Sequence, residues 1–334
     1  MVNPLINIDI SELIRIVKSY GAYFGSAVGF PIAFRDRELE FRRLVNRLVG
    51  VRIVYGPLGC GKSTLLMNLA RALGEVRSDV IVVYVNFEEK GFMNAVRAYI
   101  PGLAGGVKEL IIRAVERDLG PVLDRVGLSA IVGVGKLFMD IIKGVSDDAA
   151  IRDRYVVLIF DELDKWYRSM LNAPDNAQVG YGPIEGEVMS YAEHFENFLT
   201  TDKVQGLSVV FGFSDQGAVN VVRKYGGKGL LEGLLLWYIP KADFMDVLNE
   251  VIVKARPSGL INAELLWQLT GGNLRELARI VFNNDWSIER WLRDVIIKLG
   301  GVNGILSLLE EVSKYGFNVA ELGPWVWQCS PRGI

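Results

Sequence analysis

The stretch RIVYGPLGCGKSTLL, residues 52–66, decides the fold. It joins an apolar, strand-like run to a helix-like one, and three glycines crowd between them. Gly56, four residues, Gly61, Lys62 and Ser63 fit the pattern GxxxxGK[ST] without deviation. Between a strand and a helix, such a loop points its backbone N–H groups at an anion near the positive end of the helix dipole. The stretch therefore predicts a nucleotide-phosphate site rather than a structural glycine turn.

The loop also assigns roles to single residues. Lys62 is expected to reach the β- and γ-phosphates, and the Ser63 hydroxyl is expected to bind Mg²⁺. Cys60 has two interpretations: a permissive position, or a thiol of lowered pKa whose oxidation blocks nucleotide entry. The residues expected to contact the nucleotide here are Gly56, Pro57, Leu58, Gly59, Cys60, Gly61, Lys62, Ser63 and Thr64.

A second polar cluster follows the apolar run VVLIF, at DELDK. Adjacent residues on a strand point to opposite faces, but at the end of a strand both Asp161 and Glu162 can reach the same crevice. Asp161 is expected to hold Mg²⁺, and Glu162 to deprotonate the water that attacks the γ-phosphate. The alternative is that both acids merely begin a surface loop. An acid pair favours hydrolysis over phosphate transfer to a small molecule.

The order of apolar runs predicts an α/β fold with a mostly parallel sheet. Three β-rich runs, DVIVVYVNF, YVVLIF and LSVVFGF, are typical of strands buried on both faces. Helical patterns separate them, the longest over residues 91–144. Ligands of such sheets bind at the carboxyl ends of the strands, where the polar clusters fall.

Local patterns predict the helices around the phosphate loop. Residues 9–20 have the spacing of an amphipathic helix, and residues 21–31 are expected to be flexible. A helix before the loop is expected to direct Leu39, Leu44 and Leu48 to the core and its arginines to solvent. Gly74 is expected to end the helix after the loop.

We expect four regions along the chain. Residues 1–29 form an N-terminal helical extension and residues 30–240 the nucleotide-binding core. Residues 241–285 form a helical lid, and residues 286–334 a short helical or reduced winged-helix segment. The helices past Pro240 are expected at 241–255, 261–269, 273–284, 287–299 and 302–315.

Composition excludes several classes. A net charge of −2 over 334 residues gives no general attraction to nucleic acid. Two cysteines are too few for a disulfide framework or a zinc site. The N-terminus lacks the pattern of a signal peptide, and the uncharged stretch 21–34 cannot span a bilayer, so we expect a cytoplasmic protein without membrane contact.

Five motifs in order, FRDRELEFRRL, GPLGCGKSTLL, LIFDELDK, VVFGFSD and TGGNLREL, resemble the archaeal ATPase family. That family belongs to the AAA+/STAND group of P-loop NTPases and is similar to the origin-recognition ATPases. The resemblance covers about residues 30–285 and implies ATP or ADP and Mg²⁺ as cofactors.

The resemblance also implies further site residues. The segment 32–37, with Phe34 and Arg37, is expected beside the adenine. Ser214 is expected as the sensor that hydrogen-bonds the γ-phosphate or the water, and Asp215 is the alternative. Arg275 is expected to sense the γ-phosphate from the lid, or else to be a solvated surface arginine. In a homo-oligomer, Arg223 or Lys224 is a candidate for a finger acting in trans.

Three functions follow from these expectations. The first is an ATP-hydrolysing switch whose lid moves with nucleotide state and acts on a protein partner. The second is a DNA-associated ATPase of the replication-initiator type, although residues 286–334 carry five basic and five acidic side chains and so no basic face. The third is a nucleotide-binding scaffold with little turnover. The polar loop at 172–186 has no assigned role.

Overall fold

The computed structural model describes residues 9–25, 29–46, 48–89, 95–99, 154–162, 205–214, 222 and 231–314. The loop at 172–186, Asp215, Arg223, Lys224 and most of the expected helical region 91–144 lie outside the described residues. The chain divides into two compact units, each built from two stretches of sequence. The first unit contains Met1–Val17 and Arg37–Leu236, and the second contains Lys18–Asp36 and Trp237–Ile334.

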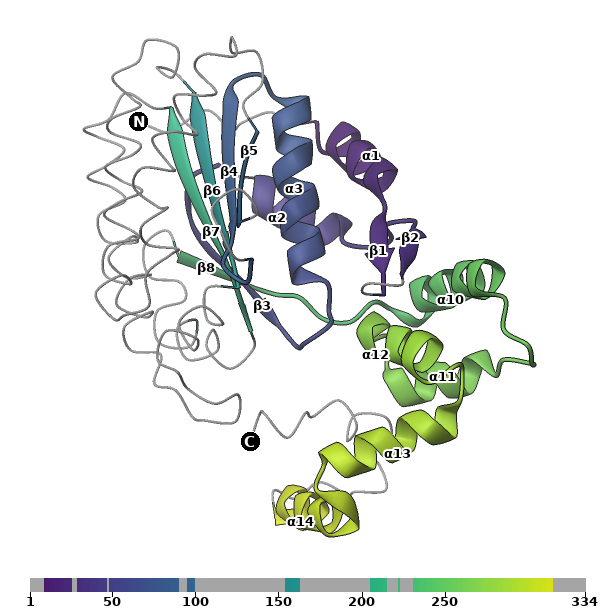
Figure 1. Cartoon of the computed structure of the whole chain (residues 1–334). Coiled ribbons are helices and arrows are strands. Elements are labelled where there is room, and N and C mark those ends of the chain that lie inside the picture. The colour runs from purple at the N-terminus through teal and green to yellow at the C-terminus, as the bar shows by residue number, and fades with distance from the viewer. Residues whose placement is uncertain are drawn as a thin grey trace. The chain divides into compact units, whose positions relative to one another are not determined.

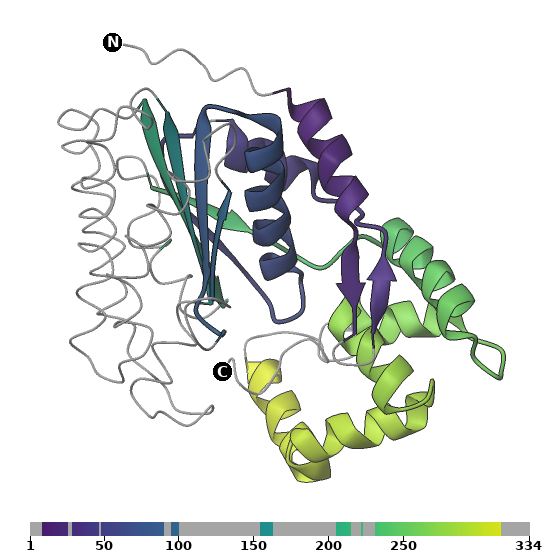
Figure 2. The same ribbon diagram turned by 45° about the horizontal axis from the view of Figure 1, so that its top comes forward.

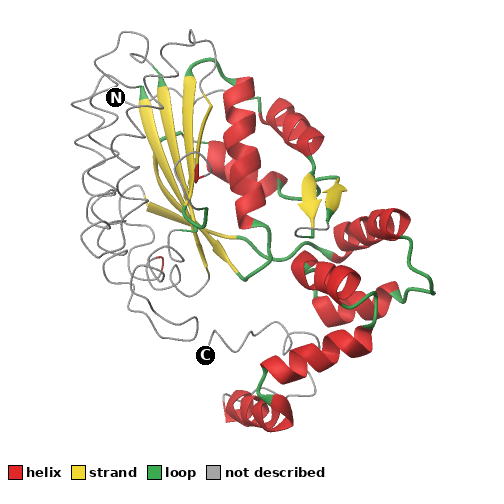
Figure 3. Cartoon of the chain, in the orientation of Figure 1, coloured by secondary structure: helices red, strands yellow, loops and turns green. Residues whose placement is uncertain are grey.

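A six-stranded sheet forms the centre of the first unit (Figure 1, Figure 3). Its strand order is β5-β4-β6-β7-β3-β8, and every pair is parallel except β4 with β5. The sheet and its helices confirm the predicted α/β class with a mostly parallel sheet. The strands are β3 (Gly50–Gly56), β4 (Val80–Asn86), β5 (Val96–Tyr99), β6 (Tyr155–Asp161), β7 (Gly206–Ser214) and β8 (Leu231–Leu235).

The central strands are buried because their side chains are apolar on both faces. Every residue of β6 is buried, and the rings of Phe160 and Phe211 stack with centroids 5.4 Å apart. The helical pattern expected from residue 91 is wrong at 96–99, where β5 adds an antiparallel edge to β4. Pairing with an exposed sheet edge overrides local helical spacing there.

Two helices of the first unit correct the sequence analysis. Helix α3 (Lys62–Val76) continues past Gly74, so the prediction that Gly74 ends it is wrong. A Cβ at position 74 would lie 2.5 Å from Cβ of Tyr99. Gly74 thus permits close packing against β5 rather than ending the helix. In α2 (Glu38–Val45), Leu44 is buried as predicted, but Leu39 is 74% exposed and the prediction for it is wrong.

The second unit combines an N-terminal pair of strands with C-terminal helices (Figure 2). Residues 21–31 were expected to be flexible, but β1 (Ala22–Phe24) and β2 (Phe30–Ile32) pair there as antiparallel strands. The rings of Phe24 and Phe30 each lie 5.7 Å from that of Phe282, and this aromatic contact stabilises the pair.

The helices of the second unit follow the predicted spacing closely. The division between the units falls inside α1 (Ile10–Tyr20). None of the described helices is long and apolar enough to cross a bilayer. The remaining elements are α10 (Lys241–Ala255), α11 (Ala263–Thr270), α12 (Leu274–Ala278), the π-helix η2 (Arg279–Asn283), α13 (Ile288–Lys298) and α14 (Gly301–Lys314).

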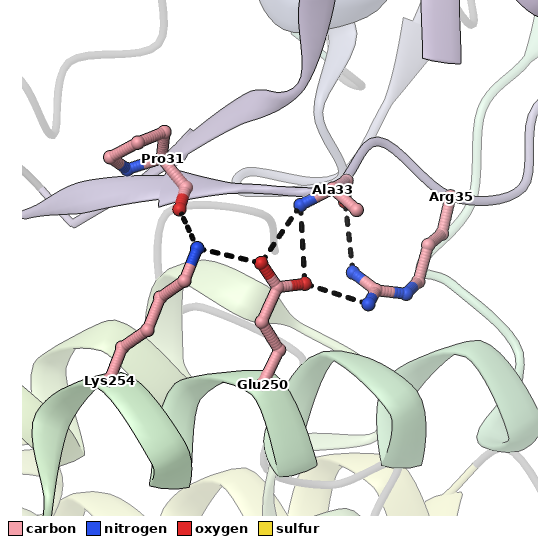
Figure 4. Close-up of polar contacts among 5 residues, drawn as sticks. All are labelled: Pro31, Ala33, Arg35, Glu250 and Lys254. Atoms are coloured by element: carbon pink, nitrogen blue, oxygen red, sulfur yellow. Dashed lines mark hydrogen bonds and ion pairs between the residues drawn. The ribbon is translucent and has the colours of Figure 1, made fainter. Parts of the chain in front are cut away.

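Glu250 of α10 binds the segment that follows β2 (Figure 4). Both of its carboxylate oxygens lie 3.2 Å from the backbone nitrogen of Ala33, which donates to them. Arg35 forms an ion pair with the same carboxylate at 2.7 Å, and Lys254 forms another at 2.8 Å. Lys254 also donates to the carbonyl oxygen of Pro31. This carboxylate therefore joins parts of the chain 217 residues apart.

These contacts perturb the carboxyl of Glu250. Burial acts to raise its pKa, but the hydrogen bonds from Lys254, Arg35 and the Ala33 N–H outweigh burial, so the pKa is lowered. A pKa lowered by folding contributes stability that is present above the unfolded pKa and is lost as pH falls through the folded pKa.

We expect Glu250→Gln to lower the free energy of unfolding of the second unit by about 1–2 kcal/mol, because charge-assisted hydrogen bonds to the 31–35 segment are lost. Amide hydrogen exchange of Ala33 measures this directly. The difference from wild type should be full above about pH 4.3, the ordinary glutamate value, and should shrink below it.

Glu264→Gln is the matched control, because Glu264 also pairs with a lysine at 2.8 Å but is 53% exposed. An exposed pair contributes little, so exchange and melting should stay close to wild type. Equal effects of the two substitutions would contradict a specific role for Glu250.

Candidate functional site

The parallel sheet brings three predicted site segments to one edge. β3 ends at Gly56, β7 at Ser214 and β6 at Asp161. Gly56 pairs with Ser214 in register, and Phe160 of β6 pairs with Phe211 of β7. Since parallel strands end at the same edge, the glycine-rich loop and the acid pair begin close together.

The glycine-rich loop has the backbone that its sequence demands. Gly61 has φ +92° and directly precedes α3, whose N-terminus has no side-chain cap. Gly56 has φ +157°, and a Cβ there would lie 1.9 Å from the carbonyl oxygen of Leu236. An uncapped helix N-terminus behind a left-handed glycine leaves backbone N–H groups for an anion.

Lys62 is buried and its ammonium lies within the curve of the loop. Nζ donates to the carbonyl oxygen of Gly56 at 2.8 Å and to that of Pro57 at 3.3 Å. Nζ therefore lies against the carbonyl oxygens of the loop, and its contact with phosphate stays a prediction.

Arg37 supports the same loop from outside. It is 5% exposed, and its guanidinium donates to the carbonyl oxygen of Cys60 at 3.0 Å and to Glu40 at 3.2 Å. The prediction that the arginines of this helix face solvent is therefore wrong for Arg37. The C=O and N–H of one trans peptide point in opposite directions. Holding the Cys60 carbonyl therefore also fixes the direction of the Gly61 N–H.

The thiol of Cys60 is buried behind the loop. Burial raises its pKa by more than the nearby cations of Lys62 and Arg37 lower it. The lowered pKa on which the oxidation hypothesis depended is therefore wrong. A buried thiol of raised pKa is a poor nucleophile, which favours the permissive interpretation.

The acid pair turns toward the start of α3. Glu162 has φ +58°, a left-handed conformation that is unusual for a residue with a side chain. This turn places Oε1 of Glu162 3.4 Å from the Ser63 hydroxyl, which donates to it. The side chains of both neighbouring acids thus lie beside Ser63.

Two residues that sequence reasoning missed surround the carboxylate of Asp161. Tyr84 of β4 donates its hydroxyl to Oδ2 at 2.9 Å. Gly212 of β7 leaves space, because a Cβ there would lie 2.5 Å from Oδ1. Burial raises the pKa of Asp161, while hydrogen bonds from Ser63 and Tyr84 lower it less. Burial and the neighbouring carboxylate raise the pKa of Tyr84, which stays a protonated donor.

The donor atoms at this edge fit Mg²⁺. Ser63 offers a hydroxyl and Asp161 a carboxylate, both hard oxygen donors. Within the described residues, no group of three or more His, Cys, Asp or Glu side chains could enclose a metal. A site with two protein oxygens suits a cation that keeps waters and phosphate oxygens as its other ligands.

The remaining predicted residues are placed as follows. Ser214 is the last residue of β7, at the site edge. Phe34 is buried in the segment that belongs to the second unit. Arg275 is exposed on α12, whose N-terminus is capped by the Asn273 side chain. The motif TGGNLREL thus encodes a helix end, a tight turn and a new capped helix.

A protein-family comparison matches most of the chain. A family described as an ATPase domain predominantly from Archaea matches residues 34–280. An ORC1-type DNA replication protein of Thermoplasma volcanium is 31% identical over 120 residues, which cover 33% of this chain and 28% of that protein.

Two solved structures show weak likeness. The Aeropyrum pernix ORC2 protein in its ADP form is 16% identical, with a TM-score of 0.43 over 78% of this chain and 67% of that one. Cdc6p of Pyrobaculum aerophilum is 17% identical, with a TM-score of 0.41 over 79% and 65%.

We expect Gly212→Ala to displace the Asp161 carboxylate, because the new Cβ would meet Oδ1 at 2.5 Å and Cδ1 of Leu66 at 2.8 Å. Overpacking of this kind costs about 1–3 kcal/mol, measured by chemical unfolding. Mg²⁺-dependent nucleotide binding should weaken as well.

Gly259→Ala provides the control, since a Cβ at Gly259 meets nothing within 4 Å. It should unfold and bind as wild type does. If Gly212→Ala has the stability and the Mg²⁺ dependence of wild type, the space beside Asp161 is not needed for folding or for Mg²⁺-dependent nucleotide binding.

Proposed function

We propose that this chain, which belongs to the archaeal ATPase family, binds ATP with Mg²⁺ and hydrolyses it to ADP and phosphate. One observation carries the proposal: the sheet brings Lys62, Ser63 and the acid pair to one edge, with Ser63 Oγ 3.4 Å from Oε1 of Glu162. A glycine turn with a purely structural role would not require a lysine, a hydroxyl and two acids beside it.

Each residue then has a chemical task. The loop N–H groups and Lys62 bind the phosphates, and Ser63 and Asp161 would hold Mg²⁺, which neutralises phosphate charge when bound. Glu162 accepts a proton from water as the water oxygen bonds to the γ-phosphorus. The bond from that phosphorus to the bridging oxygen breaks, and ADP leaves with the electron pair. Ser214 and Arg275 remain the proposed γ-phosphate sensors.

We expect Lys62→Ala to abolish nucleotide binding, since the cation within the loop is lost. Glu162→Gln should bind ATP as wild type does but hydrolyse it about 10²–10⁴-fold more slowly, because the proton acceptor is gone. Fluorescent-nucleotide binding and phosphate release measure the two effects separately.

Glu75→Gln, in the last turn of α3 and 48% exposed, makes the same chemical change away from the site. It should leave both measurements unchanged. ATP hydrolysis by Glu162→Gln at the wild-type rate would show that Glu162 is not the general base. If the wild-type protein binds ATP tightly but does not hydrolyse it, the scaffold hypothesis is favoured.

We further propose that the ATPase serves a DNA-associated function of the replication-initiator type. The similarity to the ORC1-type DNA replication protein supports this over the protein-partner switch that the sequence analysis placed first. The similarity spans only 28% of that relative, so the DNA contact is a proposal. With a net charge of −2, contact must come from a local basic patch.

We expect duplex DNA to bind the ATP-loaded protein, with an affinity that falls steeply as salt is raised, because phosphate contacts release counterions. Fluorescence anisotropy between about 50 and 200 mM salt measures the slope. Lys62→Ala tests whether nucleotide is required. No binding at the lowest salt would return the protein-partner switch to first place.

A further inference from the structure

The Asp161 carboxylate is fixed at both of its oxygens. Oδ2 accepts the hydroxyl of Tyr84 at 2.9 Å, and Oδ1 accepts the backbone N–H of Glu162 at 3.1 Å. The side chain is 1% exposed, so water does not compete freely for these oxygens. An ionised carboxylate only accepts hydrogen bonds, and the Tyr84 hydroxyl therefore donates.

Three strands contribute to this arrangement. Tyr84 comes from β4, Asp161 from the end of β6, and Gly212 from β7 on the other side. Asn86 pairs with Asp161 in register, so Tyr84 lies two residues back on the neighbouring strand. From there a tyrosine is long enough to reach the carboxylate diagonally. A phenylalanine at position 84 could pack in the core without any hydrogen bond. The tyrosine instead buries a hydroxyl, which requires a hydrogen-bond partner.

We propose that Tyr84 is a positioning residue that holds the Asp161 carboxylate in the orientation that binds Mg²⁺ beside Ser63. This inference rests on the proposed Mg²⁺·ATP function and adds a residue to it. The physical basis is preorganisation: a ligand whose orientation is fixed by a partner does not lose rotamer freedom when the metal binds.

The hydroxyl of Tyr84 also limits how the carboxylate turns. With Oδ2 accepting from Tyr84 and Oδ1 accepting from the Glu162 N–H, the carboxylate cannot turn without losing a hydrogen bond. Without the hydroxyl, Oδ2 would remain buried with one donor fewer. The carboxylate would then be free to adopt rotamers that do not serve the metal.

The test is Tyr84→Phe, which removes one hydroxyl and keeps the ring. A fluorescent ADP analogue is titrated in EDTA, and Mg²⁺ is then titrated into the complex, so that metal binding is measured at equilibrium without turnover. We expect the Mg²⁺ concentration at half of the fluorescence change to be about 10-fold or more higher in Tyr84→Phe than in wild type. This is the scale found when hydrogen bonds that support a metal ligand are removed. Binding in EDTA should match wild type.

Tyr155→Phe is the matched control, because Tyr155 is also buried and begins the strand that Asp161 ends. It should leave the Mg²⁺ titration unchanged even if it lowers the melting temperature. In an Asp161→Ala background, Tyr84→Phe should produce no further shift, because the group that it positions is absent.

The outcomes separate the two proposals. A wild-type protein whose nucleotide binding ignores Mg²⁺ would overturn the proposed function itself. A Mg²⁺-dependent wild type with an unshifted Tyr84→Phe, or an equal shift in Tyr155→Phe, would overturn the role of Tyr84 alone.

Discussion

The parallel pairing of β3, β7 and β6 is the constraint on which the site depends. These strands are far apart in the sequence, and only their register in the sheet places Gly56 at the same edge as Asp161. Their burial follows from β-branched and aromatic side chains on both faces. The positions of the site residues therefore depend on the packing of the core. Gly212 illustrates this, because a Cβ there would meet both the core residue Leu66 and the site residue Asp161.

Left-handed backbone occurs at this edge both in a glycine and in a residue with a side chain. The left-handed glycine before α3 leaves the helix N-terminus open, and the left-handed Glu162 turns a second acid toward Ser63. For Glu162, which is not a glycine, this backbone costs of order 1–3 kcal/mol and persists where the surroundings determine it. In the glycine-rich loop, Lys62 and Arg37 donate to backbone carbonyl oxygens and so help to hold its shape.

Much of the fold was predictable because its signals are local. The GxxxxGK[ST] pattern, the buried β runs and the helix spacing past Pro240 each depend on neighbouring residues, and they indicated the α/β class and most helices of the second unit. The errors concern tertiary contacts: Gly74 faces Tyr99, and Arg37 reaches the loop rather than solvent. Tyr84 gave no signal because one tyrosine in an apolar strand looks like core.

The contact between Ala33 and Glu250 spans 217 residues, and it has a consequence for biosynthesis. Residues 18–36 leave the ribosome before the described strands of the sheet, and the helices that they pack against are made after those strands. During that interval Phe24 and Phe30 have no partner helices to pack against, whereas the described strands of the sheet are all made before residue 237. The second unit can therefore close only after the described strands of the sheet have been synthesised.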